Sequence, residues 1–521
     1  MTVLGCSFAL AGAHIAPLLY LTLTTAISLE LNAPSLTIWL FTAGMVAAGA
    51  LAPFVGPLAD MFGRRVLFII GLVLSISGAI ICSTTPTAPS FIAGQCLLGL
   101  GAVIQELLAI AVVAESVPTT KRSLYAALIL CTIIPWSPGT LYANWISDSN
   151  WRWIGCALAS WNLLTMIIIA AFYHPPPRIN SLGLSRREMV RRIDFVGGVL
   201  STAGLVFVLV GLNSGGRSHP WRSAYVLGFL ALGTCFMVVF GLWEWFGTRY
   251  PLFPRRIIHA PRPFFCILLV IFTAGINYIP LVVFWPIESI SVYGLGRHQT
   301  GVSTLPIGMG ILGGAILSAL LISIFKRRIM LVMSFFCMLQ TVASAFLVLI
   351  RPHDIRSAWA PIVLALIGVG GVLVPNQVVI TVITPDDLIA TVTALTVGLR
   401  AQAQVVGLTI YYNRFIYEVT RNAYKDILPA MISIRVYNTT VITDMVTGLT
   451  SVPFDQYAQR IPQLSIPANY ELVKEATIQC FSKSFILVYY ITIAFGVVAC
   501  IAAVCMGDIF EYLDNHVAVV L

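Results

Sequence analysis

Long apolar runs separated by short polar segments dominate this chain. Fourteen of these runs have the length of about 18–25 residues that a helix needs to cross a bilayer. Because helices satisfy their own backbone groups in lipid, we expect an all-α integral membrane protein. The expected spans are 3–27, 36–58, 66–82, 89–113, 124–146, 153–173, 195–213, 223–246, 264–284, 301–324, 330–350, 359–382, 390–411 and 485–507.

Composition excludes an ordinary soluble protein. The 521 residues are 58% hydrophobic and only 10% charged, whereas soluble domains carry about 25% charged residues. The formal net charge of +9 lies mostly in short loops, so it indicates membrane topology rather than nucleic-acid binding. The first apolar run lacks a basic leader and is expected to be a retained span.

The distribution of Lys and Arg predicts the orientation. With a cytoplasmic N-terminus, the inner loops hold sixteen of these residues and the short outer loops hold six, which agrees with the positive-inside rule. Both termini are then cytoplasmic, and 412–481 is the one long outer loop. This loop contains the glycosylation sequence that starts at Asn438. Its apolar patches at 427–432 and 446–449 predict short helices on the outer surface, and 174–194 predicts a basic amphipathic helix at the inner leaflet.

Enzyme and metal sites find no support in the sequence. The seven histidines have no paired spacing, the eleven cysteines show no metal-ligand pattern, and no P-loop motif is present. We therefore expect no cofactor, no metal and no catalytic centre. The cysteines are expected to be packing residues, with a Cys82–Cys480 disulfide as an alternative.

The segment 56–65, Gly-Pro-Leu-Ala-Asp-Met-Phe-Gly-Arg-Arg, lies between the second and third spans. It resembles the loop between the second and third helices of major facilitator superfamily transporters. The resemblance implies that the segment gates the inner face, whereas a purely topological signal is the alternative. The residues concerned are Gly56, Asp60, Gly63, Arg64 and Arg65.

Two further motifs support that resemblance. Glu115, Pro118 and Arg122 follow a second facilitator signature after the fourth span, and 191–198 with 243–245 resembles the two additional helices of fourteen-span members. The resemblance implies the major facilitator fold with two pseudo-symmetric six-helix halves and two inserted helices. The expected boundaries are 1–173 for the first half, 174–263 for the insertion and 264–521 for the second half, which includes the 412–481 loop.

Motifs at 101–107, 284–286, 368–375, 389–395 and 411–415 narrow the resemblance. They are similar to the fungal trichothecene efflux pump family and to its siderophore-transporter relatives, over nearly the whole chain. The sequence departs from common drug antiporters at Gln95, where many facilitators carry an Arg, and at 135–139. It also begins without the polar tail that relatives usually have, which we interpret as a shortened N-terminus.

Ionisable residues within spans are costly and are therefore candidates for function. Glu106 in the fourth span is the candidate proton-coupling site. Arg400 in the thirteenth span is a candidate for binding an acidic substrate, and structural pairing with Glu106 is the alternative. His14 in the first span is a third titratable candidate. Other polar and aromatic residues could line a central cavity or simply pack: Gln105, Asn277, Tyr278, Trp285, Asn376 and Gln377.

The resulting hypothesis is a secondary active transporter that exports small organic molecules such as a fungal secondary metabolite, mycotoxin or drug. We expect a proton-coupled monomer that works by alternating access and has no nucleic-acid partner. The plasma membrane is the expected location, with vacuolar or vesicular membranes as alternatives. Two other functions stay open, an importer of siderophore iron or another small molecule and a non-transporting membrane receptor.

Overall fold

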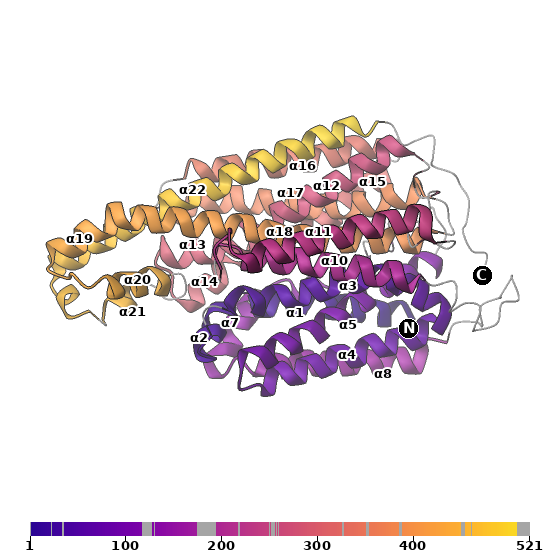
Figure 1. The fold of residues 1–521 in the computed structure, drawn as a ribbon, viewed down its shortest axis with the longest axis horizontal. Coiled ribbons are helices and arrows are strands. Elements are labelled where there is room, and N and C mark those ends of the chain that lie inside the picture. The colour runs from indigo at the N-terminus through magenta and orange to yellow at the C-terminus, as the bar shows by residue number, and fades with distance from the viewer. Residues whose placement is uncertain are drawn as a thin grey trace, which may run out of the picture.

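The computed structural model describes residues 2–507 with internal gaps, which are 22, 34–35, 117–124, 126–127, 130, 175–193, 217–218, 249–250, 252–255, 257, 259, 326–327, 351–353, 385–387, 450–453 and 460. The described residues form a bundle of nearly parallel helices (Figure 1). Twelve of the helices are long and apolar enough to cross a membrane. The expected all-α membrane fold is therefore confirmed.

The first group of helices comes from the N-terminal third of the chain. The major helices pack around α5, which contacts α1, α3 and α4, while α8 packs on α1 and α4. The members of this group are α1 (Thr2–Leu21), α2 (Thr24–Glu30), α3 (Thr37–Phe62), α4 (Arg64–Thr84), α5 (Ala88–Ser116), the 3₁₀ turn η3 (Ile134–Trp136), α7 (Gly139–Ser149) and α8 (Trp153–Phe172).

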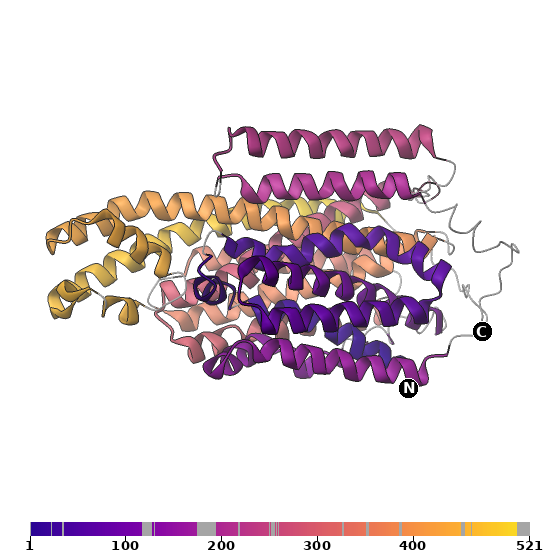
Figure 2. The same cartoon turned by 60° about the horizontal axis from the view of Figure 1, so that its bottom comes forward.

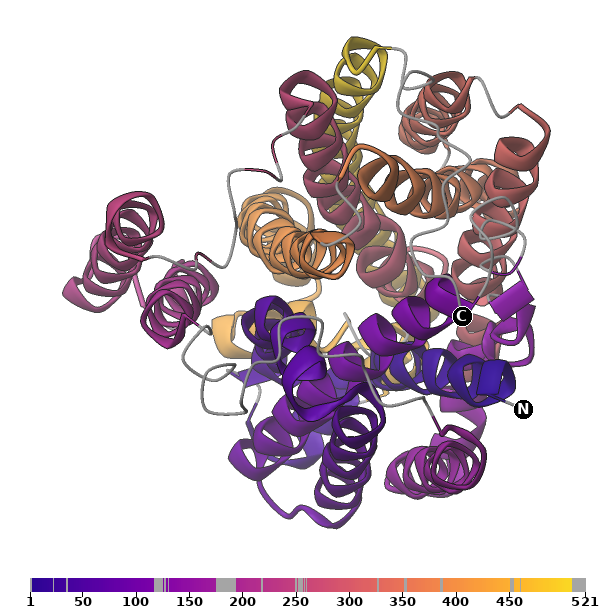
Figure 3. The same ribbon diagram turned by 90° about the vertical axis from the view of Figure 1, so that its right-hand side faces the viewer.

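The second group follows residue 260 and forms the other side of the bundle (Figure 3). Here α17 packs between α15 and α16, and α12 packs on α18 and α22. The helices are α12 (Pro261–Ile279), the π-turn η6 (Pro280–Phe284), α13 (Trp285–Ser291), α14 (Arg297–Ser303), α15 (Leu305–Ile324), α16 (Ile329–Val348), α17 (Ile355–Val382), α18 (Ile389–Asn422) and α22 (Pro467–Cys505).

Small residues let the helices within each group approach closely. A side-chain carbon added at Gly99 of α5 would lie 2.0 Å from the Gly44 carbonyl oxygen of α3. One added at Gly370 of α17 would lie 1.8 Å from the Ile311 oxygen of α15. Membrane helices have little hydrophobic drive to associate within lipid, so backbone contacts of this kind contribute much of the packing energy.

A separate pair of helices, α10 (Phe195–Ser214) and α11 (Ala224–Leu242), stands beside the two groups, as Figures 2 and 3 show. The Asn213 side chain of α10 donates to Thr42 Oγ1 of α3 at 3.1 Å, and Thr202 donates to the Ala50 carbonyl oxygen at 3.2 Å. After α11, the Trp243 side chain in the π-turn η4 (Trp243–Gly247) donates to Asp194, which caps α10. The pair thus hydrogen-bonds to α3 of the first group, and it also packs on α18 of the second.

Two of the fourteen expected spans are not among the twelve. The fifth, 124–146, falls partly outside the described residues, and its described part contains η3 and α7. The thirteenth, 390–411, lies within the 34-residue helix α18, where Arg400, Gln402 and Gln404 lower the mean hydropathy. The count of fourteen therefore stays a prediction.

The 412–481 segment differs from the expected surface loop. It continues α18, adds the π-turn η8 (Ala423–Ile427), α19 (Leu428–Ser433), α20 (Thr439–Gly448), α21 (Phe454–Ala458) and η9 (Pro462–Ser465), and includes the start of α22. Its apolar patches do not lie flat on a surface, because Ile427, Met431 and Leu449 are fully buried in one hydrophobic cluster. We call this projecting unit, residues 412–481, the cap.

The cap defines one end of the molecule, which we call the cap end. Figure 1 shows α19–α21 projecting at this end and the N-terminus at the opposite one. Arg65 at the start of α4 donates to the Ala170 carbonyl oxygen near the end of α8 at 2.6 Å, and Thr2 donates to the Phe172 oxygen. These contacts place the 56–65 turn at the opposite end from the cap, which we call the terminal end. All eleven cysteines are free, so the alternative Cys82–Cys480 disulfide is wrong; Cys82 packs against α5 and Cys480 against α18.

Candidate functional site

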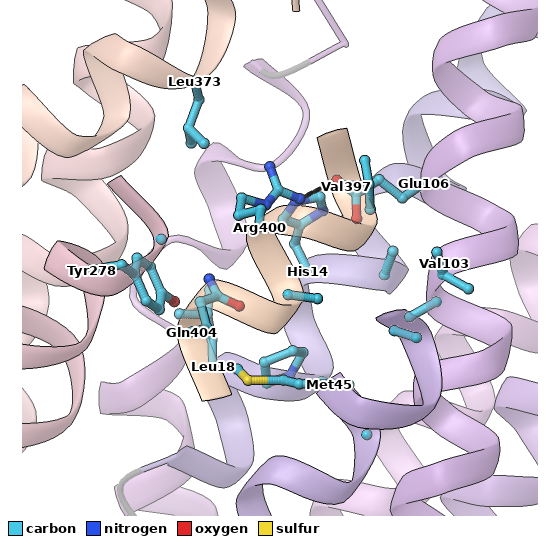
Figure 4. Close-up of a pocket in the computed structure, with 18 of the residues that line it drawn as sticks. His14, Leu18, Met45, Val103, Glu106, Tyr278, Leu373, Val397, Arg400 and Gln404 are labelled. Atoms are coloured by element: carbon cyan, nitrogen blue, oxygen red, sulfur yellow. Dashed lines mark hydrogen bonds and ion pairs between the residues drawn. The ribbon is translucent and has the colours of Figure 1, made fainter. Parts of the chain in front are cut away.

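A cavity of about 270 Å³ lies between the two groups of helices. It is lined by residues of α1, α3 and α5 from the first group and of α12, α15, α17 and α18 from the second. Most of the wall is aliphatic or aromatic, and Figure 4 shows Leu18, Met45, Val103 and Leu373 on it. Clefts of this kind, apolar with a few placed polar groups, are typical of binding sites for small organic molecules.

An ion pair crosses the cavity from one group of helices to the other. Arg400 Nη2 of α18 lies 2.5 Å from Glu106 Oε1 of α5, and Figure 4 shows the two side chains meeting in the cavity. The exposed fractions are 23% for Arg400 and 14% for Glu106. Both charges thus sit in a water-poor setting, where an unpaired charge is expensive and pairing is strongly favoured.

His14 of α1 completes this charged centre. Its Nε2 lies 3.9 Å from Glu106 Oε1, and its Nδ1 lies 3.0 Å from the Leu10 carbonyl oxygen. A carbonyl oxygen only accepts, so Nδ1 must carry a proton, and Nε2 of the neutral ring then faces the carboxylate with a lone pair. His14, Glu106 and Arg400 thus place two titratable side chains and a guanidinium group together in the cavity.

Uncharged polar groups lie around the charged centre. Tyr278 and Gln404 line the wall beside Arg400 (Figure 4). Gln377 donates to Thr396 Oγ1 at 3.0 Å, and Asn376 is buried with no partner for its amide oxygen. The wall thus offers a few hydrogen bonds to a bound molecule, too few for a highly hydroxylated sugar but enough to orient an apolar compound.

Three of the expected cavity residues lie elsewhere. Gln105 faces α4 and donates to Ser75 Oγ at 2.7 Å. Trp285 is buried in α13 and donates to the Ser303 carbonyl oxygen at 2.8 Å. Asn277 is fully buried in α12, with no partner for either amide atom. None of the three lines the cavity. Gln105 and Asn277 nevertheless belong to helices that do line it, and Trp285 begins α13, which continues α12 through η6.

The 56–65 turn is built around Gly63, whose φ of +85° suits a residue without a side chain. It separates α3 from α4 and leaves Arg64 buried at the first position of α4. Gly56 lies on α3. The Asp60 and Glu115 side chains, together with Pro118 and Arg122, lie outside the described residues, as does the expected amphipathic helix at 174–194. Asn438 is exposed on the cap, one residue before α20.

Comparison with known proteins identifies the family to which the chain belongs. A family model described as fungal trichothecene efflux pump (TRI12) matches residues 28–521. The chain belongs to this family. Membership confirms the resemblance found in the sequence, and it identifies the chain as an efflux transporter of small organic molecules within the major facilitator superfamily.

Individual relatives of this efflux-family member are distant in sequence. The trichothecene efflux pump TRI12 of Fusarium sporotrichioides is 24% identical over 497 residues, which are 89% of this chain and 78% of that protein. The aspyridones efflux protein of Neocamarosporium betae is 27% identical over 382 residues, or 72% of this chain and 66% of that protein. Among solved structures, the proton:xylose symporter XylE bound to 6-bromo-6-deoxy-D-glucose superposes with a TM-score of 0.56 at 12% identity, covering 96% of this chain and 94% of that one. This likeness supports the fold alone.

Sequence reasoning missed several lining residues. Gln404 lies one helical turn after Arg400, so it shares the same face of α18 and could have been found from that spacing. Gln95 was noted only as a departure from a motif, yet it lines the cavity. Tyr20 and Phe41, near the cap-end parts of α1 and α3, also line it, and nothing in the local sequence separates them from packing residues.

Proposed function

We propose that this efflux transporter exports small, largely apolar, uncharged organic molecules in exchange for protons. The observation that carries the proposal is the Glu106–Arg400 ion pair, which joins the two groups of helices inside an apolar cavity. A proton on Glu106 removes its charge and with it the main attraction to Arg400. Protonation can therefore weaken the contact between the groups, which alternating access requires.

The charge of the cargo decides the direction of coupling. An anionic cargo that pairs with Arg400 needs Glu106 to be neutral, so cargo and proton would bind together and travel the same way. An uncharged cargo that donates a hydrogen bond to the Glu106 carboxylate binds best when Glu106 is ionised. Proton and cargo then compete, and by reciprocal linkage each displaces the other. Exchange of this kind drives export when the outside is more acidic.

An importer would need a different cargo charge and the opposite direction of proton coupling. Uptake of an acidic metal-binding compound, the alternative left open by the sequence, would use Arg400 as an anion site and would move a proton inward with the cargo. The aliphatic wall and the occupied Arg400 favour the uncharged cargo instead. A receptor that moves nothing would leave the ion pair with a purely structural role.

Several further assignments complete the proposal. The buried Arg64 and the Arg65–Ala170 contact support a gating role for the 56–65 turn at the terminal end, with Asp60 as its acidic partner. The terminal end faces the cytoplasm and the cap faces outward, where Asn438 carries a glycan. We place the transporter as a monomer in the plasma membrane, with 1–173, 174–263 and 264–521 as its two halves and the insertion.

The test uses the purified protein in liposomes that contain a pH-sensitive dye. A panel of uncharged hydroxylated apolar compounds is compared with carboxylic acids of the same carbon skeletons, under an imposed pH gradient. We expect the uncharged compounds to accelerate proton movement against their own flux at least tenfold over empty liposomes. Carboxylic acids that move together with protons would establish the importer, and no movement with any compound would favour the receptor.

Matched carboxyl variants show whether the coupling belongs to Glu106. Glu106→Gln should abolish the dependence of transport on the pH gradient. Glu30→Gln removes a carboxylate outside the cavity and should leave the coupling unchanged. A Glu106→Gln protein with the pH dependence of the unaltered one would contradict the coupling role.

A further inference from the structure

The two groups of helices meet a second time, away from the cavity. At the cap end, α7 of the first group packs on α14 and α15 of the second, and Figure 1 shows α7 and α14 near the base of the cap. Thr304, between α14 and α15, donates its hydroxyl to Thr140 Oγ1 of α7 at 2.9 Å, and both residues are buried. Ser137, just before α7, and Gly308 of α15 both line the cavity, so this meeting of the two groups forms part of the cavity wall.

The closed contact is tight at the level of the backbone. Gly308 of α15 lies against the Ser137 carbonyl oxygen, and a side-chain carbon at Gly308 would come within 1.7 Å of it. A side-chain carbon added at Gly301 of α14 would lie 3.0 Å from the Cδ1 atom of the Leu141 side chain. Such packing leaves no room for water or cargo, so these helices must separate before anything leaves the cavity through the cap end.

One ionisable pair bridges this contact at its edge. His298 Nε2 of α14 lies 3.0 Å from Asp148 Oδ2 of α7. The side chains are 65% and 41% exposed, so both are in contact with the medium on the cap side. Histidine is the side chain whose charge ordinarily changes near neutral pH, and only a charged imidazole forms an ion pair with a carboxylate.

The surroundings contain few other groups that could replace this pair. On α7 the other titratable group is Tyr142, and α15 has no charged residue. On α13 the Glu288 carboxylate accepts a hydrogen bond from Tyr489 of α22, and Tyr293 follows α13. Arg297 precedes His298, and its side chain lies outside the described residues. Two more helices, α1 and α8, pack on α7; His14 of α1 faces Glu106, and Arg152 before α8 pairs with Glu30. Asp148 is the described carboxylate within ion-pair distance of His298.

We infer that the His298–Asp148 pair is a pH-sensitive latch that holds the cap end closed. In acid medium His298 is charged, the ion pair forms and the closed state gains stability. As the pH rises above the ordinary range of histidine, the ring becomes neutral and that contribution is lost. The sign is thus closure at low pH and easier opening at high pH, set by the medium on the cap side and separate from the proton on Glu106.

Distance measurements across the gate test this latch. Spin-labelled amino acids replace Trp145 of α7 and Val302 of α14, which are both exposed, in the Glu106→Gln protein so that the cavity carboxyl does not titrate. Partly exposed ion pairs contribute little, so we expect the ratio of short to long distances to rise about two- to fivefold between pH 8 and pH 5.5.

His298→Gln and Asp148→Asn should each flatten this pH response, and either one alone suffices if the other fails to fold. His219→Gln is the matched control and should keep the response. It removes a histidine that lies between α10 and α11 and stacks on Tyr225 of α11. A full response in His298→Gln and Asp148→Asn would overturn the latch, as would a distance distribution that does not change with pH. Neither outcome bears on proton-coupled export, which the liposome assay tests separately.

Discussion

Two ion pairs join the same two groups of helices, and their surroundings differ. Glu106 and Arg400 meet at 2.5 Å in an apolar cavity, with exposed fractions of 14% and 23%. Asp148 and His298 meet at 3.0 Å at the cap end, with exposed fractions of 41% and 65%. Burial makes the first pair all-or-none, because a lone charge there is expensive. Solvent makes the second pair a weak bias. The first pair therefore suits the proposed proton coupling, and the second suits the weaker role proposed for the latch.

Breaking the cavity pair should change the stability of the protein more than any of the other substitutions. Glu106→Gln leaves Arg400 charged and unpaired, which should destabilise the protein by about 3–5 kcal/mol. The double variant Glu106→Gln/Arg400→Gln removes both charges and should recover most of that loss. Thermal unfolding in detergent measures the stabilities. Equal stability of the single and double variants would show that the pair is not energetically coupled.

Gly308→Ala attacks the gate at the cap end. The new methyl group would meet the Ser137 carbonyl oxygen at 1.7 Å, so the closed state cannot form without moving α7 or α15. Overpacking of this kind typically costs about 1–3 kcal/mol, and we expect transport to fall at least tenfold. Gly313→Ala on the same helix is the control, because a side-chain carbon added at Gly313 would meet no neighbouring atom within 4 Å. Normal transport in Gly308→Ala would mean that the gate does not close in the cycle.

Thr304→Val removes one hydrogen bond between the groups while it keeps the shape of the side chain. The loss of that bond should weaken closure by about 1 kcal/mol, or roughly fivefold in the population of the closed gate, because the Thr140 hydroxyl keeps its longer bond to the Thr304 carbonyl oxygen at 3.5 Å. The spin-label distances across α7 and α14 report this population. Thr409→Val, whose hydroxyl bonds only within its own helix, should leave it unchanged.

The smallest expected effect concerns an exposed pair within the first group. Partial burial raises the pKa of Glu30, but hydrogen bonds from Arg152 and Trp151 outweigh it and hold the pKa below its usual value. The stability from this pair is present above the usual carboxyl pKa and is lost as the pH falls through the lowered one. Solvent screening limits it to a few tenths of a kcal/mol. In Glu30→Gln the free energy of unfolding should fall less, by that amount, as the pH is lowered into the acid range. An unchanged dependence on pH would show that the pair does not contribute to stability.

The sequence reveals the membrane spans and the charges within them, but it does not reveal which charges form ion pairs. Hydropathy located twelve of the spans because an 18-residue apolar run has few other uses. It could also single out Glu106 and Arg400, since charges within spans are rare. Their separation by 294 residues hides how close they lie, so pairing was only one of two alternatives. Asp148 and His298 lie in short polar segments, where charges are common and carry no signal. The apolar patches of the cap predict short helices, which α19 and α20 supply, but such patches do not reveal whether the helices pack on a surface or on one another.

Transport by the Glu106→Gln protein in liposomes measures whether the cavity carboxylate couples cargo movement to protons. The assay compares exchange of an uncharged cargo between equal concentrations with its uphill movement under a pH gradient. We predict that the variant still exchanges cargo but no longer accumulates it against a concentration difference. Uphill transport by Glu106→Gln at the rate of the unaltered protein would contradict the account, because proton coupling would then not depend on the carboxylate that joins the two groups.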